Sequence, residues 1–271
     1  MKYKLIAIDL DDTLLNTNLK ISELNKKAIL DAKRKGVYIT IATGRMLNSA
    51  MPYIQELNID IPVITYQGSY LTDVKTGKNI IKKAVPLDYA NAIIEECKLE
   101  NLHIQAYHDT TYFFEVENKY SQFYEKMSGV QGEEVGDLVR YLKYELKEEP
   151  VKLIIIDEPP KIHNAFKHFQ EKFGKHLQVL ISRPHYLEFT HIEATKGNAL
   201  AQLGSILNIP REEIIAIGDS FNDISMIEYA GLGVAIGNSA CQVKSHAQYI
   251  APTNDEDGVA DVIYRFIFGE E

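Results

Sequence analysis

The first 70 residues alternate short apolar runs with segments of helical periodicity. The opening run, residues 3–10, is almost continuously apolar, which is typical of a parallel strand covered on both faces. Ser22 is a good N-cap for the helix that follows, and Gly36 ends that helix. Two further strands and the helix between them are expected at 37–43, 62–66 and 51–57. Strands and helices that alternate over short links predict right-handed crossovers and an α/β fold with a doubly wound parallel sheet.

Beyond about residue 71 the pattern changes to that of an α+β domain. Residues 73–78 (DVKTGK) indicate a hairpin turn rather than a crossover. The strands and helices of this middle part are expected at 89–99, 103–107, 111–116, 120–127, 151–156, 161–173 and 179–182. The α/β rhythm returns after residue 188, with elements at 196–207, 214–217, 224–229, 233–236, 249–251 and 259–268. We therefore expect an α/β core, residues 1–83 and 187–271, that carries an inserted α+β cap, residues 84–186.

Composition and charge exclude several kinds of partner. The 271-residue chain is 45% hydrophobic and 25% charged, and its formal net charge is −9. No run of Lys or Arg suits nucleic acid or an anionic membrane, and no apolar stretch approaches the about 18 residues of a membrane span. The two cysteines, Cys97 and Cys241, are far apart and are expected to be free thiols in a reducing compartment. We expect a cytoplasmic protein, a monomer or weak homodimer, whose partner is a small molecule.

Three carboxylates fall within four positions where the first predicted strand ends, at Asp9, Asp11 and Asp12. Ligands of open α/β sheets bind at the carboxyl ends of the strands, so this edge is the expected place for a site. Carboxylates this close repel one another unless solvent or a cation surrounds them. Because a buried strand precedes them, the sequence favours a hard divalent ion such as Mg²⁺, with a solvated acidic turn as the alternative.

A second acidic cluster, GDSFND at residues 218–223, follows another apolar strand. Its position at the end of a strand is the same as that of the first cluster. A helix cap could account for Asn222 or Asp223 alone, but it leaves Asp219 unexplained.

Two weaker signals indicate phosphate binding. The Thr43-Gly44-Arg45 segment follows the second strand and offers a hydroxyl and free backbone N–H groups to an anion. Lys196 opens a helix, where its charge is unfavourable with the helix dipole unless an anion lies nearby. Each signal has an ordinary alternative, which is a Thr-Gly loop without function in one case and a surface lysine in the other.

In this order, residues 9–13, 43–45, 195–197 and 218–223 resemble the motifs of the haloacid dehalogenase superfamily of phosphohydrolases, and more narrowly those of its Cof-type branch. The resemblance covers essentially the whole chain. It implies a Rossmann-like core with an α/β cap inserted between the second and third motifs. One departure concerns the loop after the third strand, where such proteins often have Asn-Gly and this chain has Gln67-Gly68.

The resemblance implies a role for each motif residue. Asp9 would be the nucleophile and Asp11 the general acid and base, with Mg²⁺ held by Asp9, the Asp11 main-chain carbonyl and Asp219. The residues implied for phosphate binding are Leu10, Thr43, Gly44, Lys196 and Asn222, and those implied as supports are Thr13, Ser220 and Asp223. Arg45, Arg183 and His185 are either substrate contacts or surface and structural side chains.

The implied function is that of a Mg²⁺-dependent phosphatase, which hydrolyses a small phosphorylated metabolite through an aspartyl phosphate. A sugar phosphate is the first expectation for the substrate. Two alternatives stay open. A phosphomutase on the same scaffold would return the phosphate to the sugar and release little of it. A catalytically idle ligand-binding or regulatory protein would need neither Asp9 nor Asp11, so the presence of both residues counts against it.

Overall fold

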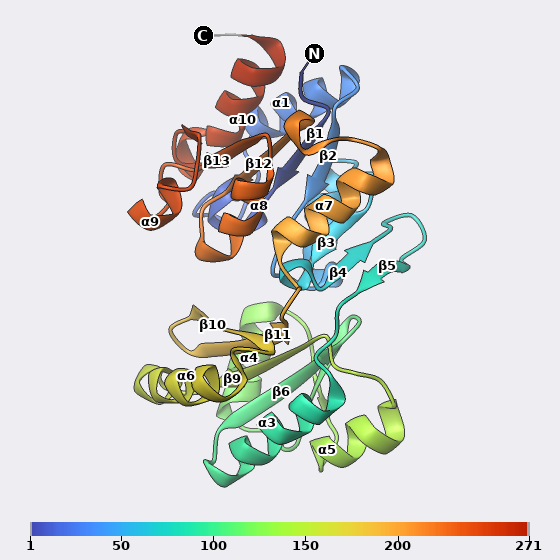
Figure 1. Cartoon of the computed structure of the whole chain (residues 1–271), viewed down its shortest axis with the longest axis vertical. Coiled ribbons are helices and arrows are strands. Elements are labelled where there is room, and N and C mark those ends of the chain that lie inside the picture. Colours follow the sequence, from blue (N-terminus) through green and yellow to red (C-terminus); the bar gives the residue numbers. More distant parts are fainter. Residues whose placement is uncertain (1, 270–271) are drawn as a thin grey trace. The chain divides into compact units, whose positions relative to one another are not determined.

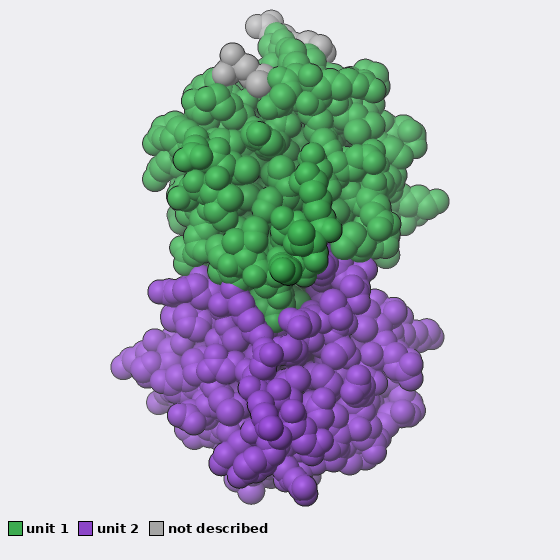
Figure 2. All heavy atoms as spheres, turned by 90° about the vertical axis from the view of Figure 1, so that its right-hand side faces the viewer, with its two compact units in different colours: residues 1–45, 50–81, 195–271 green, residues 46–49, 82–194 purple. Residues whose placement is uncertain are grey.

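The computed structural model describes residues 2–269, which divide into two compact units (Figures 1 and 2). Unit 1 comprises the chain up to residue 45, residues 50–81 and the chain from residue 195 onward. Unit 2 comprises residues 46–49 and 82–194. Within the described residues, no helix combines the length and the apolar composition that a membrane crossing requires.

Unit 1 is built on a five-stranded parallel sheet with the strand order β14-β13-β12-β1-β2. All four residues of β1 are buried, as expected for the central strand of a sheet that is covered on both faces. The bounds of the strands are β1 Leu5–Ile8, β2 Tyr38–Ile41, β12 Ile214–Gly218, β13 Leu232–Ala235 and β14 Tyr249–Ile250. The predicted α/β fold with a doubly wound parallel sheet is confirmed.

Helices connect these strands, with α1 packed against α10 and α7 against α8. The predicted N-cap of α1 is confirmed, because the Ser22 hydroxyl accepts a hydrogen bond from the Asn25 backbone N–H at 3.0 Å. The helices of this unit are α1 Glu23–Arg34, α2 Leu47–Glu56 (of which residues 47–49 group with unit 2), α7 Lys196–Leu207, α8 Ile224–Tyr229, α9 Cys241–Lys244, and α10 Gly258–Ile263, which continues into η7 Tyr264–Phe268. Single helical turns lie at η1 Leu10–Leu14, η2 Tyr66–Gly68, η4 Arg211–Glu213, η5 Phe221–Asp223 and η6 Asn254–Glu256.

The third predicted strand differs from the expectation. Strand β3 (Val63–Thr65) touches the parallel sheet through one bridge, between Ala42 and Ile64. Its regular pairing is antiparallel to β4 (Tyr70–Thr72), in a three-stranded sheet that ends with β5 (Asn79–Lys82). The predicted turn at 73–78 closes β4 onto β5, with the Asp73 backbone N–H bonded to the Lys78 carbonyl at 3.0 Å.

Unit 2 is an α+β structure with a six-stranded sheet in the order β10-β11-β9-β6-β7-β8. Its pairs are antiparallel except for β7 with β8. The strands are β6 His103–His108, β7 Thr111–Phe114, β8 Glu133–Glu134, β9 Lys152–Ile156, β10 Leu177–Arg183 and β11 Tyr186–His191. The helices are α3 Leu87–Leu99, α4 Lys119–Ser128, α5 Leu138–Arg140 with η3 Tyr141–Leu146, and α6 Pro159–Phe173.

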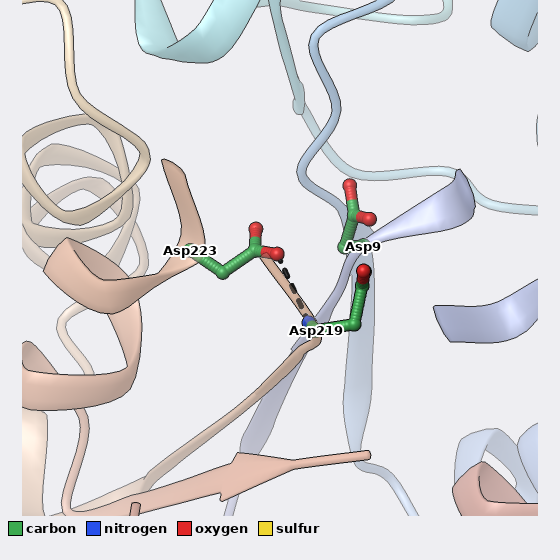
Figure 3. Close-up of side chains that lie close together, drawn as sticks. All are labelled: Asp9, Asp219 and Asp223. Atoms are coloured by element: carbon green, nitrogen blue, oxygen red, sulfur yellow. Dashed lines mark hydrogen bonds between the residues drawn. The ribbon is translucent and has the colours of Figure 1, made fainter. Parts of the chain in front are cut away.

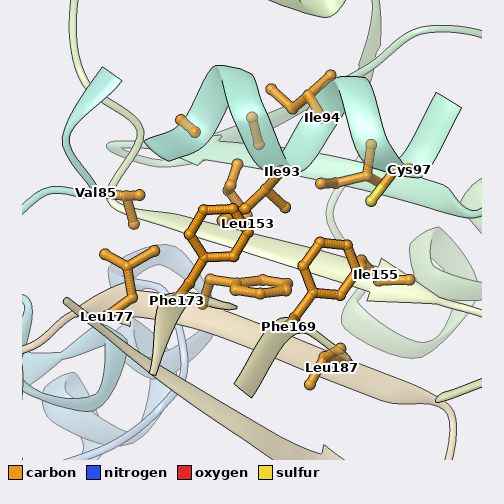
Figure 4. Close-up of a cluster of buried hydrophobic side chains, with 14 of the residues drawn as sticks. Val85, Ile93, Ile94, Cys97, Leu153, Ile155, Phe169, Phe173, Leu177 and Leu187 are labelled. Atoms are coloured by element: carbon orange, nitrogen blue, oxygen red, sulfur yellow. The ribbon is translucent and has the colours of Figure 1, made fainter. Parts of the chain in front are cut away.

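The hydrophobic core of unit 2 lies between this sheet and its helices (Figure 4). Phe169 and Phe173 of α6 pack with Leu153 and Ile155, which alternate along β9. Leu187 of β11 belongs to the same cluster and is fully buried. The sequence analysis placed the return to the core at residue 187, which instead lies inside a strand of the unit 2 sheet. Unit 2 therefore extends to residue 194.

Candidate active site

The predicted site residues of the core lie at the carboxyl ends of neighbouring parallel strands. Strand β1 runs between β12 and β2, and Ile8 pairs with both Ile217 and Ile41. Asp9 follows β1 directly, and its backbone N–H donates to the Ile217 carbonyl at 3.0 Å. The acidic cluster after β12 and the Thr-Gly segment after β2 therefore begin on either side of Asp9.

The chain turns sharply after Asp9. Asp12 has a φ of 57°, a left-handed conformation that Asp adopts more readily than most residues. The turn buries Thr13, whose hydroxyl donates to Oδ1 of Asp219 at 2.7 Å. Thr13 thus links the loop after β1 to the loop after β12, which agrees with its expected supporting position.

Three carboxylates converge at this edge (Figure 3). Asp9, Asp219 and Asp223 each place an oxygen within 4.8 Å of the other two. The backbone N–H groups of Asp219 and Ser220 both donate to Oδ2 of Asp223, at 3.0 Å each. Asp9 and Asp223 are buried and Asp219 is half-buried, and such a cluster of hard oxygen donors fits a divalent cation.

Lys196 is the cation that the structure places in this cluster. Its Nζ lies 2.6 Å from Oδ1 of Asp9 and 2.6 Å from Oδ1 of Asp223, and its side chain is 0% exposed. Thr195 caps the helix that Lys196 opens, with its hydroxyl accepting from the Asn198 N–H at 3.0 Å. Burial lowers the pKa of Lys196, but the charges of Asp223 and Asp9 outweigh it, so its pKa is raised and the ammonium stays charged.

One lysine does not balance three carboxylates. Burial raises the pKa of Asp9 well above its usual range, and Asp223 and Asp219 add to this effect although Lys196 opposes it. Burial, followed by the charge of Asp223, raises the pKa of Asp219 to about 7. With three carboxylates and one lysine, the cluster carries an excess of negative charge when all four groups are ionised, and a bound cation would offset it.

The Thr-Gly segment forms the other side of the site. Thr43 is buried, and its hydroxyl accepts from the Arg45 N–H at 3.1 Å. Gly44 packs against the end of the Gln67 side chain, which would have to move if residue 44 carried a Cβ. The sequence analysis singled out Thr43 and Gly44 as phosphate-binding residues, and the structure places them next to the strand that ends in Asp9.

The sequence analysis did not predict how Asp11 is held. Arg45 binds it in a bidentate pair, with Nε 2.8 Å from Oδ2 and Nη2 2.6 Å from Oδ1. The hydrogen bonds that Arg45 donates to Asp11 also raise the pKa of Arg45. The Arg45 guanidinium lies 5.3 Å from the ring centre of Tyr53. Arg45 follows β2, the strand next to β1, and this position in the sequence is the signal from which the contact with Asp11 could have been predicted.

Three other residues from the sequence analysis can be placed. Gln67 was noted only as a departure from the family pattern, yet its Oε1 accepts from Nδ2 of Asn222 at 2.7 Å. Arg183 and His185 lie in unit 2, at the turn between β10 and β11, and do not belong to the cluster built within unit 1. A contact of these two residues with substrate stays a prediction.

A doubly wound sheet whose strand ends gather a carboxylate cluster, a buried lysine and a Thr-Gly loop is the architecture of a phosphoryl-transfer hydrolase. Residues 6–263 match the family model of the haloacid dehalogenase-like hydrolases, so the chain belongs to that family. The Cof-type branch that the sequence indicated is confirmed, and the protein is a phosphoric monoester hydrolase.

Named relatives agree with this assignment. The chain is 33% identical to the 5-amino-6-(5-phospho-D-ribitylamino)uracil phosphatase YcsE of Bacillus subtilis, over 97% of this chain and 96% of the relative. It is 32% identical to the phosphatase YwpJ of the same organism, over 97% of this chain and 100% of the relative. Among solved structures it resembles TM0651 from Thermotoga maritima, with a TM-score of 0.87, 32% identity, and 97% of each chain covered.

Proposed function

We propose that this hydrolase is a Mg²⁺-dependent phosphatase that acts on a small phosphorylated metabolite through an aspartyl phosphate at Asp9. The observation that supports it best is the position of Lys196, 2.6 Å from both Asp9 and Asp223 beside the Asp219 carboxylate. A buried cation held against a carboxylate nucleophile suits a reaction in which a phosphate dianion must approach an anion.

Mg²⁺ would be held by the carboxylates of Asp9 and Asp219 and by the main-chain carbonyl of Asp11, with Asp223 contributing through water. When bound, the ion would offset the negative charge shared by these carboxylates and the substrate phosphate. The Thr13 hydroxyl would orient Asp219 for this purpose through its 2.7 Å hydrogen bond.

The phosphate would lie against donors of this chain. Lys196 and the Thr43 hydroxyl would bind its non-bridging oxygens together with the backbone N–H groups of Gly44 and Leu10. Lys196 and its neighbours also form the N-terminus of α7, where the helix dipole favours an anion.

In the first step an Asp9 carboxylate oxygen attacks phosphorus in line and forms a P–O bond. The bond from phosphorus to the ester oxygen breaks, its electron pair stays on that oxygen, and Asp11 gives the oxygen a proton. In the second step a water oxygen attacks phosphorus, Asp11 accepts the water proton, and the bond to Asp9 breaks to release inorganic phosphate. Before it acts as the acid, Asp11 would have to give up its two hydrogen bonds with Arg45 and contact the leaving oxygen instead.

Unit 2 would serve as the cap that selects the substrate and excludes water. A sugar phosphate is the first expectation, and the name of the YcsE relative adds 5-amino-6-(5-phospho-D-ribitylamino)uracil as a candidate. The cytoplasmic location and the monomeric or weakly dimeric state stay predictions, which cell fractionation and light scattering can check.

The test measures inorganic phosphate released from a panel of sugar, nucleotide and riboflavin-pathway phosphates, with and without Mg²⁺. Release that needs Mg²⁺ and disappears in Asp9→Asn supports the proposal. Asp60→Asn serves as the matched control, because it removes the same charge at a side chain that is 63% exposed, and it is expected to retain full activity. Activity that survives Asp9→Asn would remove Asp9 as nucleophile, and a lack of release on the whole panel would contradict the phosphatase.

A further inference from the structure

The six-stranded sheet of unit 2 has two different faces. Leu153 and Ile155 of β9 and Leu187 of β11 point into the hydrophobic core (Figure 4). Because successive side chains of a strand point to opposite faces, Lys152 and Glu188 lie on the other face. Their side chains are nevertheless only 6% and 8% exposed. Lysine and glutamate are almost never buried unless they are paired, so the partners of these two residues show what this face can bind.

Lys152, Glu188 and Thr190 form a group on this face that we call the unit 2 polar cluster. The register of β9 with β11 places Lys152 level with Thr190 and diagonal to Glu188. Nζ of Lys152 lies 3.2 Å from Oε2 of Glu188 and 4.9 Å from the ring centre of Tyr107. Thr190 is 1% exposed. The cluster therefore combines a cation, an anion and a hydroxyl in one buried place.

The Glu188 carboxylate is held in one orientation but is not fully bonded. The Ser182 hydroxyl donates to its Oε1 at 2.5 Å. Its Oε2 faces Lys152 as an ion pair, yet it accepts no hydrogen bond from any described residue. This buried oxygen can still accept a hydrogen bond from a donor on a bound molecule.

The Thr190 hydroxyl is a second buried group of the cluster without a hydrogen-bond partner among the described residues. Gln178, which pairs with Thr190 across β10 and β11, directs its Nε2 to the carbonyls of Ile192 and Ala194 instead. A buried polar atom without a partner is costly. Two such atoms on one strand, beside a buried ion pair, indicate a place that a bound molecule completes.

The chemistry of the cluster defines what fits it. The Glu188 oxygen only accepts and the Lys152 ammonium only donates, whereas the Thr190 hydroxyl does both. Because Lys152 and Glu188 together carry no net charge, the cluster does not favour a further anion. A hydroxyl group donates and accepts at the same atom, so one ligand hydroxyl can satisfy Lys152 and Glu188 together. A second hydroxyl of the same molecule can satisfy Thr190.

We propose that the unit 2 polar cluster recognises hydroxyl groups on the part of the substrate that remains after phosphate release. This inference rests on the proposed function and names its substrate class, which is a phosphate ester with several hydroxyl groups, such as a polyol or sugar phosphate. Lys152, Glu188 and Thr190 are then specificity residues, and an alkyl phosphate leaves them unpaired. The cluster is buried in this conformation, so substrate entry requires the opening that enzyme caps undergo.

The test compares esters that differ only in their hydroxyl groups. Ribitol phosphate is paired with pentyl phosphate and sorbitol phosphate with hexyl phosphate, and kcat/KM is measured for each with Mg²⁺. The better polyol phosphate is expected to exceed its alkyl partner by about tenfold or more, because a site built for hydroxyls rejects a ligand without them. A preference below about tenfold for both pairs would overturn the inference.

Two variants connect this preference to the cluster. Thr190→Val keeps the size and removes the unpaired hydroxyl, so it should melt at the wild-type temperature or above it. It is expected to lower the preference for the polyol ester by about 3- to 10-fold, the range for one neutral hydrogen bond. Lys152→Met combined with Glu188→Leu removes both charges and keeps the volume, which buried ion pairs tolerate. This double variant should lower the preference by about 10- to 100-fold, the range for hydrogen bonds to charged groups.

An exposed ion pair of the same unit gives the matched control. Lys119 and Glu158 lie 3.8 Å apart with side chains that are 71% and 58% exposed, and Glu158 is near the opposite end of β9 from Lys152. Lys119→Met combined with Glu158→Leu should leave the preference unchanged. A wild-type preference in both Thr190→Val and the Lys152 and Glu188 double variant would overturn the inference, since the cluster would then serve packing alone.

Calorimetric titration keeps the two proposals apart. The Asp9→Asn protein is titrated with the polyol and alkyl esters in the presence of Mg²⁺, so that affinity is measured without turnover. Tighter binding of the polyol ester by Asp9→Asn, with no phosphate release from any ester by the wild type, would contradict the proposed function alone. Release from both members of a pair at similar kcat/KM, lost in Asp9→Asn, would contradict the inference alone.

Discussion

Replacing Lys196 by methionine is expected to weaken both the stability and the chemistry of unit 1. The wild-type ammonium is fully buried and contacts Asp9 and Asp223, at 2.6 Å each. Methionine has a similar length but no charge, so it fills the space and leaves both carboxylates without their cation. Asp223 keeps two backbone N–H donors, whereas Asp9 loses the one ion pair that opposes its burial.

The size of the effect follows from the burial of the pair. Removing one partner of a buried ion pair costs about 3–5 kcal/mol, because the other charge stays in a poorly solvated place. For a folding unit of this size that is a fall of roughly 6 to 20 °C in melting temperature. Turnover is expected to fall by at least about 100-fold, since in the proposed mechanism Lys196 donates to the charge that develops on the phosphoryl group.

The assay is thermal unfolding followed by circular dichroism, together with steady-state phosphate release. Lys27→Met serves as the matched control, since Lys27 pairs with Asp31 on the surface and its side chain is 66% exposed. Adding Asp223→Asn to Lys196→Met removes one uncompensated charge and should restore about half of the lost stability. If Lys196→Met melts within about 2 °C of wild type, the lysine does not stabilise the fold by pairing with the buried carboxylates.

Two further outcomes are expected from the contacts around the site and in unit 2. EDTA should abolish phosphate release reversibly, and Thr13→Val, which removes the hydrogen bond to Asp219, should raise the Mg²⁺ concentration for half activity by about 10- to 100-fold. An unchanged Mg²⁺ dependence in Thr13→Val would contradict the proposal that Thr13 orients Asp219 as a metal ligand. In unit 2, Lys152→Met should lower the free energy of unfolding by about 3–5 kcal/mol, because Glu188 lies 3.2 Å from Nζ and both side chains are buried. The pair of changes Lys152→Met and Glu188→Leu should recover that loss in denaturant titrations, and a double variant as unstable as the single one would contradict this account.

Local signals in the sequence were sufficient for most elements. The expected helices at 196–207 and 224–229 have the bounds of α7 and α8, because a capping threonine starts one and a turn of Asn and Asp starts the other. Strand β11 was missed although Leu187 and Phe189 alternate with Glu188 and Thr190. The boundary expected between the inserted domain and the core, at residue 187, falls inside this strand, so its alternation was assigned to neither domain. The edge pairing of β3 was missed because periodicity gives no information on which neighbour a strand takes.

The backbone positions of the site were predictable and its side-chain contacts were not. Strand ends place Asp9, Thr43 and Asp219 at one edge regardless of the details of packing. The Lys196 contact with Asp9 joins residues 187 positions apart, and the Gln67 contact with Asn222 joins residues 155 apart. In loops no period of 2 or 3.6 residues sets the direction of a side chain, so these contacts depend on tertiary structure.

The arrangement of charge supports the proposal that the site uses a metal ion in addition to the lysine. Asp9, Asp219 and Asp223 with Lys196 leave two negative charges uncompensated when all four groups are ionised, which is the charge that one Mg²⁺ carries. A phosphate dianion then requires further positive charge or N–H donors. The backbone donors beside Thr43 and the Arg45 guanidinium are the groups that the structure places next to that edge. Arg45 is engaged with Asp11 in this conformation, so in the proposed mechanism phosphate binding and the release of Asp11 for proton transfer would draw on the same side chain. Substrate binding and readiness of the acid would then be coupled through Arg45.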